Sequence, residues 1–113
     1  MVKAFANAFN GIKFFFMNER NGKIQATMAA AVLFAGLYAH LSAIEWIIVL
    51  LCICAVLVLE MINSTIEHLC NMIHSEYHPV IKIIKDIAAG AVLFASIISV
   101  IIGLIIFLPK IFN

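Results

Sequence analysis

The sequence predicts an all-α integral membrane protein in which an N-terminal amphipathic surface helix precedes three transmembrane helices. An apolar composition, long uncharged windows and an uneven distribution of basic residues lead to this fold class. Hydrophobic residues make up 65% of the 113 residues and charged residues 12%, about half the charged share of a typical soluble domain. Because so small a chain cannot bury this much apolar surface in its own core, lipid is its expected solvent.

Uncharged windows define the expected spans. The windows Ile24 to Ile44 and Ile87 to Pro109 are each long enough for one spanning helix, which needs about 20 residues. Both are rich in Ala and Gly, which let helices approach closely in lipid. Pro79 suits the first turn of the third span, where its missing N–H costs nothing. We expect one membrane domain over residues 1–113, with transmembrane helices over about 24–44, 46–70 and 80–108.

The middle span carries a carboxylate at membrane depth. It is bounded by Glu45 and continues past Glu60, which lies roughly 22 Å farther along a helix that rises about 1.5 Å per residue. The hydrocarbon core is about 30 Å thick, so Glu60 is expected inside it. Glu67, two turns farther on, is expected near the interface.

Residues 1–17 are expected to form a helix on the membrane surface. One set of polar residues recurs at helical spacing, namely Lys3, Asn7, Asn10 and Lys13. Aromatic and aliphatic residues occupy other positions, namely Phe5, Phe9, Ile12 and Phe16. This amphipathic pattern is typical of a helix that lies in the interface rather than across the bilayer.

The basic residues predict the orientation. Of the seven Lys and Arg residues, only Lys110 follows the third span and none lies between the first two. The others precede the first span or lie between the second and third, namely Lys3, Lys13, Arg20, Lys23, Lys82 and Lys85. Since basic loops stay in the cytoplasm, we expect the N-terminus there and the C-terminus outside.

Polar residues of the middle span share one helical face. At about 100° per residue, the four polar residues that follow Glu60 fall with it in a strip about 100° wide. They are Asn63, Ser64, Glu67 and Asn71. Ionisable groups at this depth are costly and normally face a protein interior or a wet cleft, so this polar stripe is a functional candidate.

Structural roles are alternatives for some of these charges. Glu60 or Glu67 would form a plain ion bridge if Lys82 or Lys85 of the next helix reached it. Lys82 and Asp86 are also spaced to form a surface pair on one helix.

Other classes of site have little support. The histidines and the cysteine in and just after this segment match no zinc-binding spacing, and we interpret them as interfacial polar or small buried residues; they are His68, His74, His78 and Cys70. With a net charge of +1 and no basic run, no nucleic-acid partner is expected.

Three segments carry a family resemblance. "LEMINSTIEHLC", "HSEYHPVIKIIKDIAAGAVL" and the upstream "NERNGKIQ" resemble the bacterial membrane lipid kinases, diacylglycerol kinase and undecaprenol kinase. The shared pattern is E-x-x-N-[ST]-x-I-E, then S/P-E-Y/W-H, then K-D-x-x-A-G-A-V, and it covers about Gly11 to Ala95. The resemblance implies ATP-dependent phosphorylation of a lipid alcohol, diacylglycerol or undecaprenol, in the bacterial cytoplasmic (inner) membrane. It also implies a homotrimer with active sites shared between subunits.

The resemblance implies a role for each matched residue. Glu60 corresponds to the general base that takes the proton of the lipid hydroxyl. Glu19 and Glu67 correspond to the ligands of Mg²⁺, which binds with ATP. The ATP-binding set comprises these two and Asn63, Glu76, Tyr77, His78, Lys85 and Asp86. One departure is Asn71, where the family usually has Asp, so a charge is missing.

The chemistry of these residues agrees with phosphoryl transfer. A base must accept the proton of the nucleophile, and the phosphate charge must be neutralised. Because the chain has no G-x-x-x-x-G-K-[ST] loop, nucleotide binding must use helix side chains.

Two other functions compete with a kinase. One is a small proton-coupled transporter that uses Glu60, although the sequence has no inverted repeat. The other is a noncatalytic membrane adaptor in which the polar residues only hold the assembly together.

Overall fold

The computed structural model describes residues 1–74 and 76–112, and these residues form helices joined by short connections. The helices are α1 (Val2–Asn18), α2 (Arg20–Ala39), α3 (Ala43–Ile73) and α4 (Pro79–Ile111). By length and composition, α2, α3 and α4 are each able to cross a membrane. The predicted all-α membrane architecture with an additional N-terminal helix is therefore confirmed.

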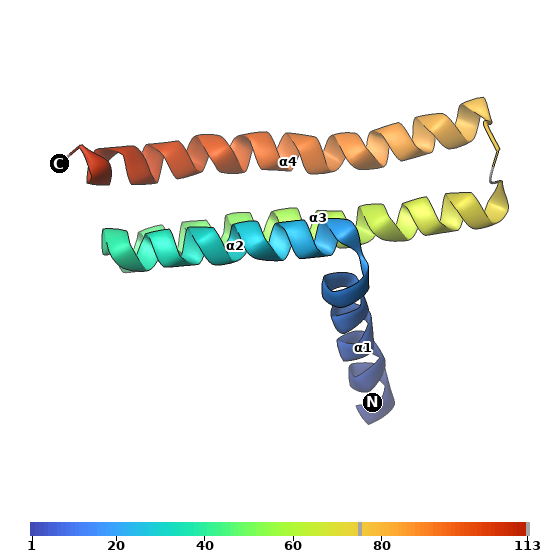
Figure 1. Ribbon diagram of the computed structural model, residues 1–113, viewed down its shortest axis with the longest axis horizontal. Coiled ribbons are helices and arrows are strands. Elements are labelled where there is room, and N and C mark those ends of the chain that lie inside the picture. The colour runs from blue at the N-terminus through green and yellow to red at the C-terminus, as the bar shows by residue number, and fades with distance from the viewer. Residues whose placement is uncertain (75, 113) are drawn as a thin grey trace.

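The three long helices lie side by side, and α1 leaves them at a steep angle (Figure 1). In chain order the long helices alternate in direction, so α3 is antiparallel to both neighbours. We call the end at residues 40–42 the turn end, and the end at the α3–α4 connection, residues 74–78, the connection end. Pro79 begins α4 as expected, with His78 as its N-cap.

The turn between α2 and α3 is fixed by local capping. His40 adopts the left-handed conformation at φ 55° and closes α2. Ser42 then caps α3: its Oγ accepts from the Glu45 N–H at 3.2 Å, and its own N–H donates to Glu45 Oε1 at 2.9 Å. The helix of the first span thus ends at Ala39 rather than near 44, because backbone capping sets a helix end and an uncharged window does not.

The long helices differ in length, so their ends do not align at one end of the bundle. α2 has 20 residues, whereas α3 has 31 and α4 has 33. At about 1.5 Å per residue, α2 just matches the hydrocarbon core of about 30 Å. A salt bridge of 3.0 Å between Lys110 Nζ and Glu45 Oε1 joins α3 and α4 at the turn end. The additional turns therefore project past the start of α2 at the connection end (Figure 1).

Little of the chain is buried within a single copy. The apolar cluster consists of Leu41, Val49 and Ile106, with partly buried neighbours from all three long helices. Most large apolar side chains of the spans are exposed. Such a surface requires lipid or other protein copies around it, as expected for a membrane protein.

Candidate active site

The polar stripe of α3 is buried over its first half. Glu60 is 8% exposed, Asn63 5% and Ser64 8%, and within residues 1–74 and 76–112 these are the buried polar side chains. Glu60 Oε2 and Asn63 Oδ1 have no hydrogen-bond partner in that part of the chain. Because buried polar atoms are normally satisfied, these two oxygens are available to a ligand.

The stripe runs from a buried carboxylate to an exposed one. Glu67 lies one turn after Asn63 and is exposed. Asn63 Nδ2 donates to Glu67 Oε1 at 3.5 Å, which is a long and weak hydrogen bond. The stripe therefore connects the apolar interior of the bundle with the level at which α2 begins.

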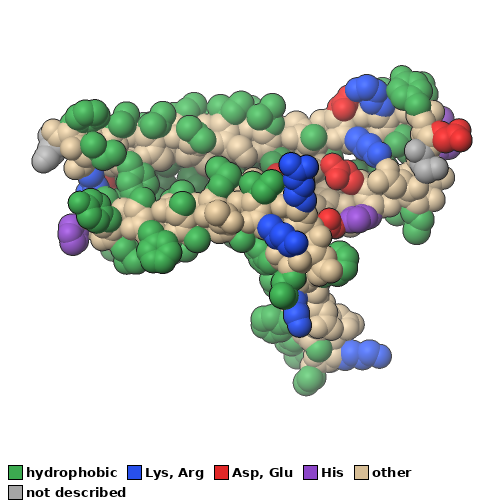
Figure 2. Space-filling view, in the orientation of Figure 1, with side chains coloured by type: hydrophobic (Ala, Val, Ile, Leu, Met, Phe, Trp, Pro, Cys, Tyr) green, Lys and Arg blue, Asp and Glu red, His purple; other side chains and the backbone are tan. Residues whose placement is uncertain are grey.

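A third carboxylate reaches this level from the α1–α2 junction. Glu19 separates the two helices, and its backbone is extended at φ −89° and ψ 134°. Its Oε1 contacts Nε2 of His68, the residue after Glu67. Charged side chains gather around this corner and the neighbouring parts of α3 and α4 (Figure 2). The structure thus brings Glu19 close to the polar stripe.

Lys85 reaches the stripe from α4. Its Nζ donates to Asn71 Oδ1 at 2.6 Å. Lys82 instead pairs with Asp86 on its own helix at 2.6 Å, and both side chains are more than half exposed. In the described residues, neither Glu60 nor Glu67 forms an ion bridge with either lysine. Of the two predicted structural roles for these charges, the described residues show the surface pair of Lys82 with Asp86.

The remaining expected nucleotide contacts lie in the connection after α3. Glu76, Tyr77 and His78 are exposed. His78 Nδ1 accepts from the Val80 N–H at 3.2 Å and so caps α4. None of the three forms a hydrogen bond with the polar stripe within the described residues, and Ser75, which begins the "SEYH" motif, lies outside them.

The carboxylates at this level suit Mg²⁺. Mg²⁺ is commonly held by one or two carboxylates together with substrate phosphates and water. Glu19 and Glu67 supply two such oxygen donors, from the junction and from the exposed end of the stripe. Clusters of three or more His, Cys, Asp and Glu side chains do not occur in the described parts of the chain. Glu19 and Glu67 are therefore the candidate protein ligands of such an ion.

Two residues of this region received no role from the sequence. Ser64 was grouped with the stripe, and its burial equals that of Glu60. His68 was interpreted as an interfacial residue, but it contacts Glu19. Its helical angle gives the only hint: eight residues at about 100° each place His68 about 80° from Glu60, at the margin of the stripe.

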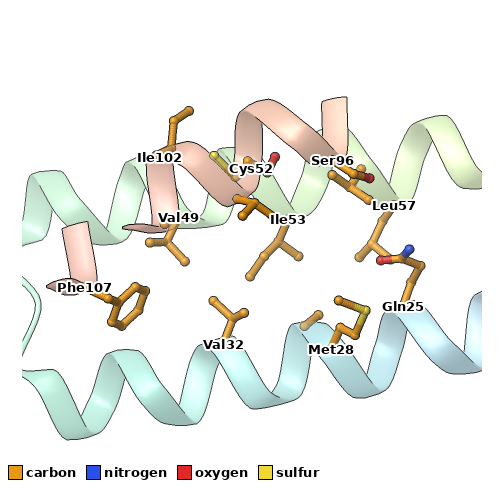
Figure 3. A pocket seen from close by; sticks show the side chains of 15 residues that line it. Gln25, Met28, Val32, Val49, Cys52, Ile53, Leu57, Ser96, Ile102 and Phe107 are labelled. Carbon is orange, nitrogen blue, oxygen red and sulfur yellow. The ribbon is translucent and has the colours of Figure 1, made fainter. Parts of the chain in front are cut away.

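An apolar cavity of about 240 Å³ lies between α2, α3 and α4. Figure 3 shows its walls, with Gln25 and Leu57 at one end and Phe107 at the other. Leu57 is one helical turn before Glu60, so the cavity begins next to the buried carboxylate. Apart from Ser96 and Ser99, its other lining residues are apolar, which suits a hydrocarbon chain better than a polar ligand.

Comparison with known proteins gives one consistent result. The family model described as prokaryotic diacylglycerol kinase matches residues 6–107. The chain is 46% identical to the undecaprenol kinase of Bacillus subtilis (strain 168) over 108 residues, which cover 96% of this chain and 88% of that protein.

More distant relatives agree. The chain is 35% identical to the diacylglycerol kinase of Synechocystis sp. over 114 residues, which cover 100% of this chain and 65% of that protein. It is 27% identical to the diacylglycerol kinase of Escherichia coli (strain K12) over 101 residues, covering 89% and 83% respectively.

Proposed function

Because this chain belongs to the prokaryotic diacylglycerol kinase family and is a membrane lipid kinase, we propose that it transfers the γ-phosphoryl group of ATP directly to the hydroxyl of a lipid alcohol. The observation that carries this proposal is the buried Glu60 carboxylate, which lies on one helical face with Asn63 and Glu67. The transporter alternative has no support, since the named relatives are kinases.

Glu60 acts as the general base of this reaction. The lipid oxygen forms a bond to the γ-phosphorus while the bond from that phosphorus to the β–γ bridging oxygen breaks. ADP leaves, and Glu60 takes the hydroxyl proton. Burial supports this role, because the exposed Glu67 and the partly exposed Glu19 carry carboxylates nearer the water, while Glu60 lies where the hydroxyl of a lipid can reach.

Glu19 and Glu67 hold Mg²⁺ together with the phosphates of ATP. When bound, the ion neutralises charge on the phosphoryl group that is transferred. Asn63 contacts ATP beside Glu67, to which its amide donates a long and weak hydrogen bond. Lys85 and Asp86 contact the phosphates and their hydrogen-bond network. Glu76, Tyr77 and His78 contact the nucleotide from the connection.

Polyprenol is the preferred acceptor in this proposal. The higher identity to the undecaprenol kinase, 46% against 35% and 27% for the diacylglycerol kinases, favours undecaprenol. The apolar cavity that begins next to Glu60 would accommodate part of the hydrocarbon chain of either lipid.

The enzyme works as a homotrimer with sites shared between subunits. The exposed apolar surface of the spans supports assembly, and in a single copy the end of the stripe at Glu67 and Asn71 remains exposed. The basic residues favour a cytoplasmic N-terminus and an external C-terminus in the bacterial inner membrane. The connection end, with its charged side chains, then faces the cytosol and its ATP.

A direct assay tests the activity. Purified protein in lipid nanodiscs is incubated with γ-labelled ATP, Mg²⁺ and equal amounts of undecaprenol and diacylglycerol, and labelled lipids are separated. We expect labelled undecaprenyl phosphate in excess over labelled phosphatidic acid. Label mainly in phosphatidic acid would overturn the preference, and no labelled lipid of either kind would contradict the proposed reaction.

A further inference from the structure

The α1–α2 junction holds Glu19 through its backbone. The Glu19 N–H donates to the Phe15 carbonyl at 3.2 Å, and the Glu19 carbonyl accepts from the Lys23 N–H at 3.1 Å. Glu19 thus ends one helix and begins the next, and its own extended backbone makes the bend. The direction of its side chain therefore depends on the angle between α1 and α2.

Close contact between Phe15 and Gly22 sets this angle. A Cβ atom on Gly22 would lie 2.0 Å from the Phe15 carbonyl oxygen and 2.8 Å from its carbonyl carbon. Phe15 is also the buried residue of α1, at 4% exposure, whereas Phe9 and Phe14 are more than half exposed. Because the obstacle is backbone rather than a flexible side chain, any larger residue at position 22 must open the bend.

His68 holds the same carboxylate from α3. Its Nε2 contacts Glu19 Oε1 across 49 positions of sequence. The Glu19 side chain is 23% exposed and that of His68 66%, so the histidine approaches from the water side. This contact joins the junction to the helix that carries Glu60, Asn63 and Glu67.

We propose that His68 and the Phe15–Gly22 contact form a clamp that positions Glu19 beside the polar stripe of α3. His68 is a positioning residue in this proposal: it fixes the Glu19 carboxylate at the level of Glu67, where both can bind Mg²⁺ with ATP. The role of the clamp in catalysis rests on the proposed function. Its effect on the junction does not.

Steady-state kinetics test the catalytic part. His68→Ala should raise the KM for MgATP by up to about five-fold, the range expected for one exposed charged contact, and leave the KM for the lipid unchanged. His68→Gln, whose amide can still donate to Glu19, should have a KM for MgATP close to that of the parent enzyme. His40→Asn is the matched control, because it removes a histidine at the turn end and Asn tolerates the left-handed conformation. An unchanged KM for MgATP in His68→Ala would overturn the proposal.

Hydrogen–deuterium exchange tests the clamp without nucleotide or lipid substrate. Peptides covering residues 15–23 should exchange faster in His68→Ala than in the parent enzyme, and faster still in Gly22→Ala, because both open the junction. Peptides of α4 should be unchanged, which excludes general unfolding. If Gly22→Ala does not fold, the comparison of His68→Ala with His68→Gln is sufficient to test the clamp. Parent-like exchange in His68→Ala contradicts the clamp, whereas a failure of lipid phosphorylation in the parent protein contradicts only the proposed function.

Discussion

Lys85 Nζ donates to Asn71 Oδ1 at 2.6 Å and so links α4 to α3 at the exposed end of the polar stripe. The partner of the ammonium group is a neutral amide, so the positive charge of Lys85 is not cancelled at this contact. This charge is therefore available to an anion near the stripe, which supports the proposed contact of Lys85 with phosphate.

Asn71→Asp should weaken ATP binding. The new carboxylate would form an ion pair with Lys85 and reduce its attraction for phosphate, so we expect the KM for MgATP to rise up to about five-fold. The rise should shrink at high salt, which screens exposed charges. Asn10→Asp on α1 is the control for the added charge. An equal rise in both variants would assign the effect to net charge rather than to Lys85.

Glu60→Gln should nearly abolish turnover while the protein still binds ATP. An amide cannot accept the hydroxyl proton, and loss of a general base typically lowers the rate about 10²- to 10⁴-fold. The assay is lipid phosphorylation combined with calorimetric titration of MgATP. Glu45→Gln removes a carboxylate at the turn end and should keep its activity within about two-fold of the parent, because the site is far along α3. Retention of more than half the rate in Glu60→Gln would remove Glu60 from its role as base.

Val56→Trp should raise the KM for the lipid by filling the cavity between α2, α3 and α4. Val56 lines that cavity, and the indole ring would occupy the volume that we assign to a hydrocarbon chain. The KM for MgATP should not change. Leu50→Trp is the control, since Leu50 is 51% exposed and lies outside the cavity lining. A normal lipid KM in a well-folded Val56→Trp protein would show that the chain of the substrate lies elsewhere.

Ser42→Ala should lower stability without changing the kinetics. The Ser42 side chain caps α3 and is paired reciprocally with Glu45, and loss of such a cap costs about 1 kcal/mol. Thermal unfolding in detergent measures the effect. Thr27→Ala also removes a hydroxyl, but its Oγ1 only donates to the Lys23 carbonyl within α2, so its melting temperature should stay near that of the parent. An equal decrease in melting temperature in Ser42→Ala and Thr27→Ala would mean that the Ser42 cap makes no specific contribution to stability.

The periodic part of the site was predictable from the sequence. Glu60, Asn63, Ser64 and Glu67 were assigned to one face by helical angles alone, and the structure buries the first three together. This succeeds because side-chain direction within one helix depends only on residue spacing. The membrane class followed in the same way, because composition and uncharged length decide whether a helix is stable in lipid.

Contacts between helices were not predictable. The pairing of His68 with Glu19 and of Lys85 with Asn71 depends on how elements pack, and no local pattern encodes it. The close approach at Gly22 was also not predictable. A single glycine in a helix can have many causes, and the structure shows that here the Phe15 carbonyl leaves no room for a side chain. The end of α2 at Ala39 is likewise not marked by charge, because the uncharged window continues through the turn at His40.

The unequal helix lengths have a consequence for the host membrane. α2 has no residues to spare for a thicker bilayer, whereas α3 and α4 have surplus turns at the connection end. In thicker lipid α2 would be too short to span, so the bilayer would thin around it or its ends would be drawn toward the hydrocarbon while α3 kept its position. Glu19 would then slide relative to Glu67, so acyl-chain length in the surrounding bilayer should tune the rate of this enzyme.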